Sequence, residues 1–220
     1  MENNNLNTQP TETTMEIKPR RNIWRVVRII FAVIIVLYIG LVIYRIPAAK
    51  ERLRTQEAVT KIHAQKLTLA DVMGQNLPPE PDPALKDATL EGIDKNNNGI
   101  RDDVELSIFK LHPDSARIRE AELQYAMELQ AKLVDVFNSD TWITLAKYES
   151  GIDCIVDVAS DKYTDIKDQI KMSDEWGKEV RDLVFNTQSR ISKVKDTDKY
   201  QVAFSTGTKS CAIDLKQFPN

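Results

Sequence analysis

The stretch ARIREAELQYAMELQAKLVDV, residues 116–136, decides the fold class of this chain. Its apolar side chains recur at intervals of three or four residues, at Ile118, Ala121, Tyr125, Leu129, Leu133 and Val136. This spacing places them along one face of an α-helix, and that face leaves water only by packing against other elements. We therefore predict a long helix that packs inside a helical bundle.

The residues that follow carry further helical patterns. Asn138–Asp140 is expected to end the first helix and to cap a second one that continues to Val156. A shorter helix is expected within residues 160–172, and Ser173 is expected to cap a further long helix with an apolar stripe. Residues 200–220 lack helical periodicity, which predicts an irregular or short β segment.

These patterns predict an all-α fold, a bundle of about four to five helices with an irregular C-terminal tail, in a domain at residues 84–220. Residues 102–111 are expected to form the first of these helices. The preceding segment 47–83 reads as a helical stalk and a linker, because its first part is charged and its last residues are LPPEPDP. Between them, Thr68 and Asp71 have the spacing of a capping box that opens a short helix.

The N-terminal part of the chain predicts a membrane anchor. Residues 1–22 are polar and are expected to form a disordered tail on the cytoplasmic side. Ile29–Tyr44 contains no charged residue, and with its flanks it defines a transmembrane helix at residues 23–46. Trp24 and Tyr44 lie where aromatic side chains meet the membrane interface.

A cleaved signal peptide is the alternative to an anchor that stays in place. Its cleavage site would need small residues in an A-x-A arrangement, whereas Arg45–Ala49 reads RIPAA. The arginines within residues 20–28 are denser than the positive charges after the span. By the positive-inside rule, we expect a cytoplasmic N-terminus and an extracytoplasmic domain, which in a bacterium means the inner membrane and the periplasm.

Charge and glycine content exclude several classes of function. Residues 1–49 hold six Lys and Arg against three Asp and Glu, so the excess of acidic residues lies in residues 50–220. An acidic domain lacks the basic face that phosphate backbones require, so we expect no nucleic-acid partner. Only seven glycines occur in the chain, which disfavours sheet-rich folds and glycine-loop nucleotide folds.

The strongest chemical signal is the twelve-residue stretch DKNNNGIRDDVE, residues 94–105, which matches the calcium-loop pattern D-x-[DN]-x-[DN]-G-x5-E. A hard cation needs six to eight oxygen atoms in a small volume, and this spacing wraps one segment around it. The predicted calcium ligands are the side chains of Asp94, Asn96, Asn98 and Asp102, the backbone carbonyl of Ile100, and both carboxylate oxygens of Glu105. The alternative is an Asn-Gly turn whose aspartates stabilise a helix N-terminus.

At these residues the stretch resembles the EF-hand family, and more closely the thrombospondin type 3 and bacterial EF-hand-like loops, with units of the form D-x-D-x-D-G-I-x-D-x-x-E. It departs from a paired EF-hand because position eight is Arg101, the incoming helix is too short, and no second loop exists. Residues 77–130 also resemble small uncharacterised exported bacterial proteins with a solitary loop. Lys95 and Arg101 oppose a cation, so we expect weak binding, on the order of 10⁻⁴ M, and a structural role.

Two cysteines give an independent indication of compartment. Cys154 falls on an apolar helix face and Cys211 in the tail. Given the predicted export, we expect a disulfide that fixes the tail to the bundle. The alternative is two separate buried thiols.

No catalytic motif is present. His63 and His112 form no zinc pattern with each other or with cysteine, and the chain has no nucleophile elbow, P-loop or dinucleotide fingerprint. The sequence thus favours a membrane-anchored cell-envelope module that binds another envelope protein and is not an enzyme. Two alternatives stay open: an inhibitor or immunity-type protein that neutralises an envelope toxin, and a cell-wall-acting enzyme with a carboxylate pair assembled by the fold.

Overall fold

The computed structural model describes residues 21–148, 150–202 and 210–218, and over these residues it contains helices and no strand. The predicted all-α class is therefore confirmed. The chain divides into two compact units, residues 1–51 and 52–220. The tail expected at residues 1–22 lies outside the described residues, apart from Arg21 and Asn22, which begin the first helix.

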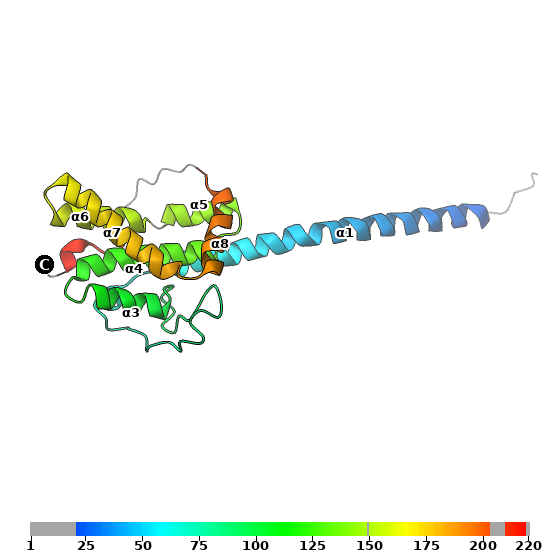
Figure 1. Ribbon diagram of the computed structural model, residues 1–220. Coiled ribbons are helices and arrows are strands. Elements are labelled where there is room, and N and C mark those ends of the chain that lie inside the picture. Colours follow the sequence, from blue (N-terminus) through cyan, green and yellow to red (C-terminus); the bar gives the residue numbers. More distant parts are fainter. Residues whose placement is uncertain (1–20, 149, 203–209, 219–220) are drawn as a thin grey trace, which may run out of the picture. The chain divides into compact units, whose positions relative to one another are not determined.

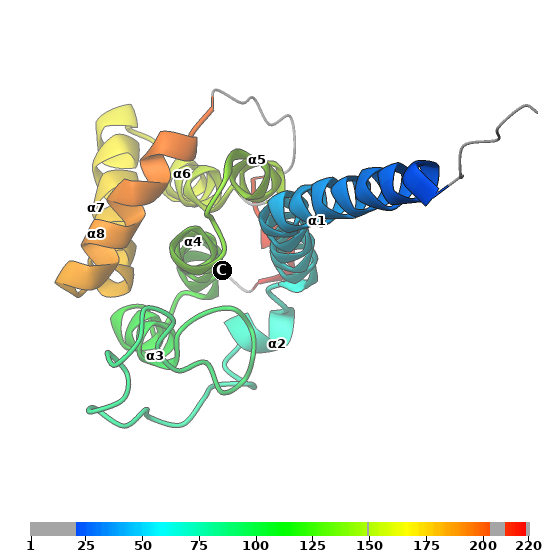
Figure 2. The same cartoon turned by 90° about the vertical axis from the view of Figure 1, so that its right-hand side faces the viewer.

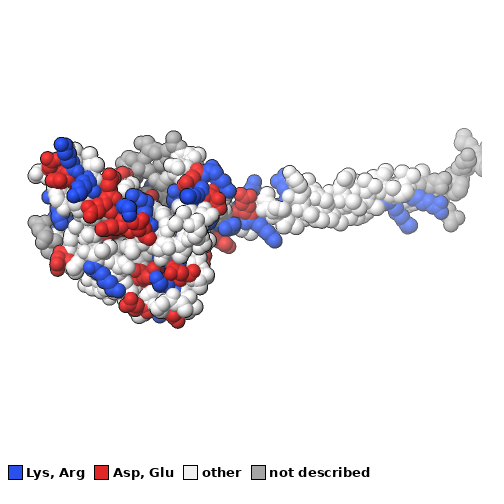
Figure 3. Space-filling view, in the orientation of Figure 1, with Lys and Arg blue, Asp and Glu red and all other residues white. Residues whose placement is uncertain are grey.

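Helix α1 (Arg21–Ala64) accounts for the described part of the first unit. In the described part of the chain it is the one helix long and apolar enough to cross a membrane, and its residues 23–50 are exposed. Figure 3 shows that much of its surface carries no charged side chain. α1 does not end at Pro47, which lies inside it. The span predicted at residues 23–46 therefore continues without a break into the predicted stalk.

The second unit is a bundle built around one central helix. α4 (Ala116–Val134) packs against α3 (Asp102–Leu111), α6 (Gly151–Lys162) and α7 (Ile166–Val184), and it also touches α5 (Ser139–Tyr148) and α8 (Gln188–Thr197). Figures 1 and 2 show α4 enclosed by these helices. Because it is covered on several sides, α4 buries polar side chains as well as its apolar stripe, among them Glu120, Glu122 and Gln124.

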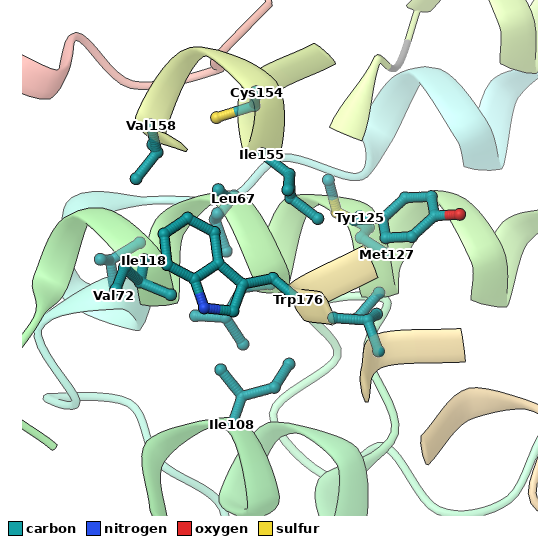
Figure 4. Close-up of a cluster of buried hydrophobic side chains, with 14 of the residues drawn as sticks. Leu67, Val72, Ile108, Ile118, Tyr125, Met127, Cys154, Ile155, Val158 and Trp176 are labelled. Carbon is teal, nitrogen blue, oxygen red and sulfur yellow. The ribbon is translucent and has the colours of Figure 1, made fainter. Parts of the chain in front are cut away.

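The main apolar core surrounds Trp176 of α7. The Trp176 residue is only 3% exposed. Figure 4 shows its indole among Val72, Ile108, Ile118 and Val158. These four side chains come from α2 (Leu69–Val72), α3, α4 and α6. One tryptophan therefore holds several helices together, and truncating such a buried aromatic side chain costs about 3–5 kcal/mol.

The end of α1 belongs to this second unit. Ile62 is 1% exposed and packs with Ala131, Val136 and Leu145 in a smaller apolar cluster. Nearby, Asn138 Nδ2 donates a hydrogen bond of 2.8 Å to Thr55 Oγ1. The stalk predicted within residues 47–83 thus contributes side chains to the bundle.

Two helix boundaries differ from the prediction, and the separate helix expected within residues 160–172 is wrong, because these residues belong to the end of α6 and the start of α7. The helix expected to run from Asn138 to Val156 is two helices, α5 and α6. At the start of α6, a Cβ on Gly151 would lie 2.4 Å from the Cα of Tyr125, so glycine allows α6 to approach the backbone of α4. The predicted cap at Ser173 is wrong, because α7 begins at Ile166 after the cap Asp165, whose Oδ1 accepts from Lys167 N at 2.7 Å.

Other local predictions are confirmed. Thr68 and Asp71 form the capping box of α2, and Gly74 follows that helix with φ of 76°. The C-terminal segment contains the short 3-10 helix η2 (Leu215–Gln217), as expected for an irregular tail, and residues 203–209 lie outside the described residues. A second 3-10 helix, η1 (Asp198–Tyr200), follows α8.

The predicted disulfide between Cys154 and Cys211 is present, with a Cα–Cα distance of 4.6 Å. It fixes the C-terminal segment to α6. The same segment is hydrogen-bonded to α4, since Gln124 Nε2 donates to Ser210 O at 2.9 Å and Ala212 N donates to Gln124 Oε1 at 2.7 Å.

A fully buried arginine of α8 orders the irregular segment before the predicted calcium loop. The guanidinium of Arg190 donates to five oxygen atoms: Lys86 O, Thr89 O, Leu90 O, Asp87 Oδ1 and Asn186 Oδ1. The buried guanidinium needs such acceptors, and the carbonyl groups of this segment have no helix or sheet partner. Segment 86–90 is therefore tied to α8 through one side chain.

Candidate metal centre

The predicted calcium loop, residues 94–105, closes on itself at the start of α3. Asp102 N donates to Ile93 O at 2.8 Å, and Asp102 Oδ1 accepts from Lys95 N at 2.9 Å. Asp102 and Glu105 lie in the first turn of α3, so a helix end carries both of the later predicted ligands.

The first predicted ligand organises the turn. Asp94 Oδ2 accepts from Gly99 N at 2.9 Å, and its Oδ1 accepts from Asn98 N at 3.3 Å. Asn97 and Gly99 have φ of 55° and 88°, a left-handed backbone that asparagine and glycine adopt most readily. Burial raises the pKa of Asp94, although the hydrogen bonds from these backbone groups oppose the increase.

The last predicted ligand, Glu105, is fully buried beside two predicted amide ligands. Its Oε2 accepts from Asn96 Nδ2 and from Asn98 Nδ2, each at 3.0 Å. Burial raises the pKa of Glu105 to about 7, and the nearby charges of Asp71 and Asp102 act in the same direction. The two amide hydrogen bonds do not offset these effects.

Two carboxylate oxygens in the loop are buried and have no hydrogen-bond partner: Asp102 Oδ2 and Glu105 Oε1. Both residues are 0% exposed, and an unpaired buried carboxylate oxygen carries a desolvation penalty of several kcal/mol. A hard cation would supply the missing positive charge. The oxygens of carboxylates and side-chain amides are the ligands that Ca²⁺ takes, so the residues present fit this ion.

The amides of Asn96 and Asn98 face Glu105 with their nitrogen atoms. To serve as ligands, each must turn about its Cβ–Cγ bond so that Oδ1 takes the place of Nδ2, a rotation that the near-equal shape of the two ends permits. In the present arrangement their N–H groups partly compensate the buried charge of Glu105. Glu105 is thus brought together with Asn96 and Asn98, with the amides in donor orientation. Over the described residues, Asp94, Asp102 and Glu105 do not form a group whose carboxylate oxygens all lie within 4.8 Å of one another.

Arg101 does not face the loop interior. It is 0% exposed, and its guanidinium pairs with Asp103 and donates to the carbonyls of Leu183 and Val184 at the end of α7. The charge of Arg101, one of the two expected to oppose a cation, is therefore engaged elsewhere. Ile100, whose carbonyl is the predicted ligand, buries its side chain in the main core and anchors the loop.

One carboxylate close to the loop, that of Asp71 in α2, lies outside the twelve-residue calcium-loop pattern. It is 4% exposed, and its Oδ1 accepts from Asn76 Nδ2 at 3.0 Å. The carbonyl of Asn76 in turn accepts from Asn96 Nδ2 at 3.0 Å. The capping box of α2 predicts a local role for Asp71, and no local signal links it to a loop more than twenty residues later.

Outside the loop, burial also acts on carboxylates of α4. Burial raises the pKa of Glu120 and of Glu128 to about 7. The cavities formed by described residues include one of about 600 Å³ beside Cys211 and Asp157. This cavity and three others of the described residues, one beside Pro81 and Leu106, one along residues 53–64 and one beside Ile118 and Val158, are not lined by a carboxylate whose pKa is raised.

Glu120 has an unusual neighbour. Its Oε1 accepts from Ile213 N at 3.1 Å, and its Oε2 lies 2.9 Å from Cys154 Sγ. Because the disulfide leaves this sulfur without a hydrogen, only a protonated Glu120 carboxyl can supply the hydrogen for the contact. The contact therefore agrees with the raised pKa.

Comparisons of the chain with protein-family models, with curated proteins and with solved structures found no match.

Proposed function

We propose that this chain is a single-pass anchored protein of the bacterial inner membrane whose periplasmic helical domain binds one calcium ion in loop 94–105 and holds an envelope protein partner. The observation that carries the calcium assignment is the pair of partnerless, fully buried oxygens, Asp102 Oδ2 and Glu105 Oε1. A bare Asn-Gly turn at a helix N-terminus gives no reason to bury them.

The proposed role of the ion is structural. The loop joins segments that are far apart in the sequence, since Asn96 contacts the carbonyl of Asn76 and Arg101 contacts the end of α7. With three carboxylate ligands, we expect a dissociation constant on the order of 10⁻⁴ M, which suits a compartment with standing calcium.

The disulfide supports the periplasmic assignment. A bond such as Cys154–Cys211 forms and persists in oxidising compartments, whereas cytosolic thiols are kept reduced. Together with the arginines that precede the span, it favours a domain outside the cytoplasm. Protease added to spheroplasts should then digest residues 52–220, and protection of these residues would contradict the orientation.

We prefer a protein-interaction role to an enzymatic one, and the four cavities described above support this choice, because none of these four is lined by a carboxylate with a raised pKa. Crosslinked affinity capture from membranes, with and without a chelator, tests for the partner. We expect a reproducible partner whose yield falls on chelation and in Asp102→Asn. Capture of the bait alone would count against the interaction role.

Calcium binding is tested by thermal unfolding of the full chain in mild detergent. At about 10 mM, the calcium concentration is about a hundredfold above the expected dissociation constant. Binding should then raise the free energy of unfolding by about 2.7 kcal/mol. Asp102→Asn should abolish this gain, as should Glu105→Gln.

The matched control is Asp140→Asn, because Asp140 is exposed and also lies in the first turn of a helix. This variant should keep the full calcium response. Equal calcium stabilisation of wild type and Asp102→Asn would refute the site, as would no stabilisation of wild type.

A further inference from the structure

A second group of metal-ligating side chains lies where α3, α4 and α7 meet. His112 directly follows α3, Glu122 belongs to α4, and Glu179 belongs to α7. Each offers one ligand atom, and these atoms all lie within 4.8 Å of one another. None of the three residues belongs to loop 94–105, so the group is independent of the proposed calcium site.

The group has more acceptors than donors. His112 Nε2 lies 3.0 Å from Glu122 Oε1 and 3.7 Å from Glu179 Oε2. A ring nitrogen carries at most one hydrogen, and the shorter distance assigns it to Glu122. Glu122 Oε2 and Glu179 Oε2 are buried and have no hydrogen-bond partner.

The negative charge of the two glutamates also favours a bound cation. Glu122 is 0% exposed, and two carboxylates share a single imidazole. A protonated His112 would offset one of the two negative charges. A divalent cation in place of that proton would offset both and would provide the partnerless oxygens with a ligand bond.

The two distances from His112 Nε2 suit a small cation with tetrahedral coordination. Zn²⁺ bonds of about 2.0–2.1 Å place neighbouring ligand atoms about 3.3 Å apart in a tetrahedron. The two separations from His112 Nε2, 3.0 and 3.7 Å, lie on either side of this value. Calcium fits poorly, because it needs six to eight oxygen ligands, whereas imidazole nitrogen suits zinc and its neighbours in the first transition row.

The backbone and ring of His112 are held in place by neighbouring residues. Arg119 Nη1 donates to His112 O at 2.8 Å and to Pro113 O at 2.6 Å. The indole of Trp176 meets the imidazole edge-on, with ring centroids 6.3 Å apart. The Glu179 side chain is 36% exposed, which leaves access for a water ligand.

We infer that His112, Glu122 and Glu179 form a binding site for a zinc-class divalent transition-metal ion, with water at the fourth position. The site would hold the end of α3 against α4 and α7. α3 then has a proposed cation site at each end, of different chemistry.

The test is calorimetric titration of the full chain in mild detergent with zinc chloride. The protein is purified through a tag without histidine, and calcium is kept saturating so that loop 94–105 does not compete. We expect one equivalent of bound zinc, and at least a tenfold loss of affinity in His112→Ala and in Glu122→Gln. The matched control is His63→Ala, which removes the other histidine of the chain and should bind zinc as wild type does.

Cobalt supplies a second readout that does not depend on binding heat. Co²⁺ in a tetrahedral nitrogen and oxygen site absorbs visible light strongly, and this absorption should appear in wild type and disappear in His112→Ala. Circular dichroism shows whether each variant is folded, and the partly exposed Glu179→Gln gives a milder perturbation. Wild-type zinc affinity in folded His112→Ala or Glu179→Gln would overturn the site, as would wild type that takes up neither metal.

Discussion

Replacing Glu120 by glutamine should stabilise the protein at alkaline pH and change little at acidic pH. The fully buried carboxyl of Glu120 has its pKa raised from 4.5 to about 7, mainly by burial. At about 1.4 kcal/mol for each pH unit between these values, ionised Glu120 costs the folded state about 3 kcal/mol. Glutamine keeps an oxygen for Ile213 N and carries no charge.

The direction follows from which state binds the proton more tightly. Below the unfolded pKa of about 4.5, the carboxyl is protonated in both states and contributes no pH dependence. Between pH 4.5 and about 7 the folded state holds the proton longer, so stability falls as pH rises, and the full cost is present above about pH 7. The free energy of unfolding of Glu120→Gln should therefore exceed that of wild type by up to about 3 kcal/mol above pH 7, and the two should agree below pH 4.5.

Urea unfolding of the full chain in mild detergent, followed by tryptophan fluorescence without reductant, measures this difference. Glu175→Gln, on the exposed face of α7, is the matched control, because it makes the same chemical change at an exposed position, and it should leave the free energy of unfolding close to that of wild type. A Glu120→Gln effect that is the same at about pH 4 and about pH 8, or destabilisation at the higher pH, would refute the reasoning.

Four further substitutions, one of them a control, test the packing and one helix cap by the same urea titration. Arg190→Met should cost about 3–5 kcal/mol, because it leaves five oxygens without their buried donor; a loss below about 1 kcal/mol would contradict the described clamp. Gly151→Ala should cost more than about 2 kcal/mol, since its Cβ meets the Tyr125 backbone, whereas Gly177→Ala faces only movable side-chain ends and should be tolerated; equal costs would disprove the contact. Thr68→Ala should lose about 1 kcal/mol with the capping box of α2, and an unchanged midpoint would argue against it.

Local signals in the sequence were sufficient for part of this fold. α3 begins and ends at the residues expected from the sequence, Asp102 and Leu111, and Thr68 caps α2 through a pattern contained within four residues. Both elements depend on neighbours along the chain. The start of α7 could not be predicted in the same way, because Asp165 and Ser173 are both good caps. The structure uses Asp165, and Ser173 Oγ donates back to Gln169 O inside the helix.

In the candidate sites too, local sequence patterns predicted some features, whereas others depend on tertiary packing. The loop pattern identified residues that the backbone brings together within twelve positions. It could not indicate the direction of Arg101, which depends on the carbonyls of α7, or the proximity of Asp71. The group around His112 joins residues 10 and 67 positions apart, and no spacing rule connects them. Only the packing of α3, α4 and α7 reveals it.

Segment 86–90 has a consequence for how this sequence can vary. Irregular surface segments usually accept insertions and deletions, because their backbone groups are satisfied by water. Here three carbonyls and one carboxylate of the segment are matched to the geometry of a single guanidinium, that of Arg190. A change of one residue in length would move several of these acceptors out of register at once. Related sequences should therefore vary in the side chains of this segment far more readily than in its length.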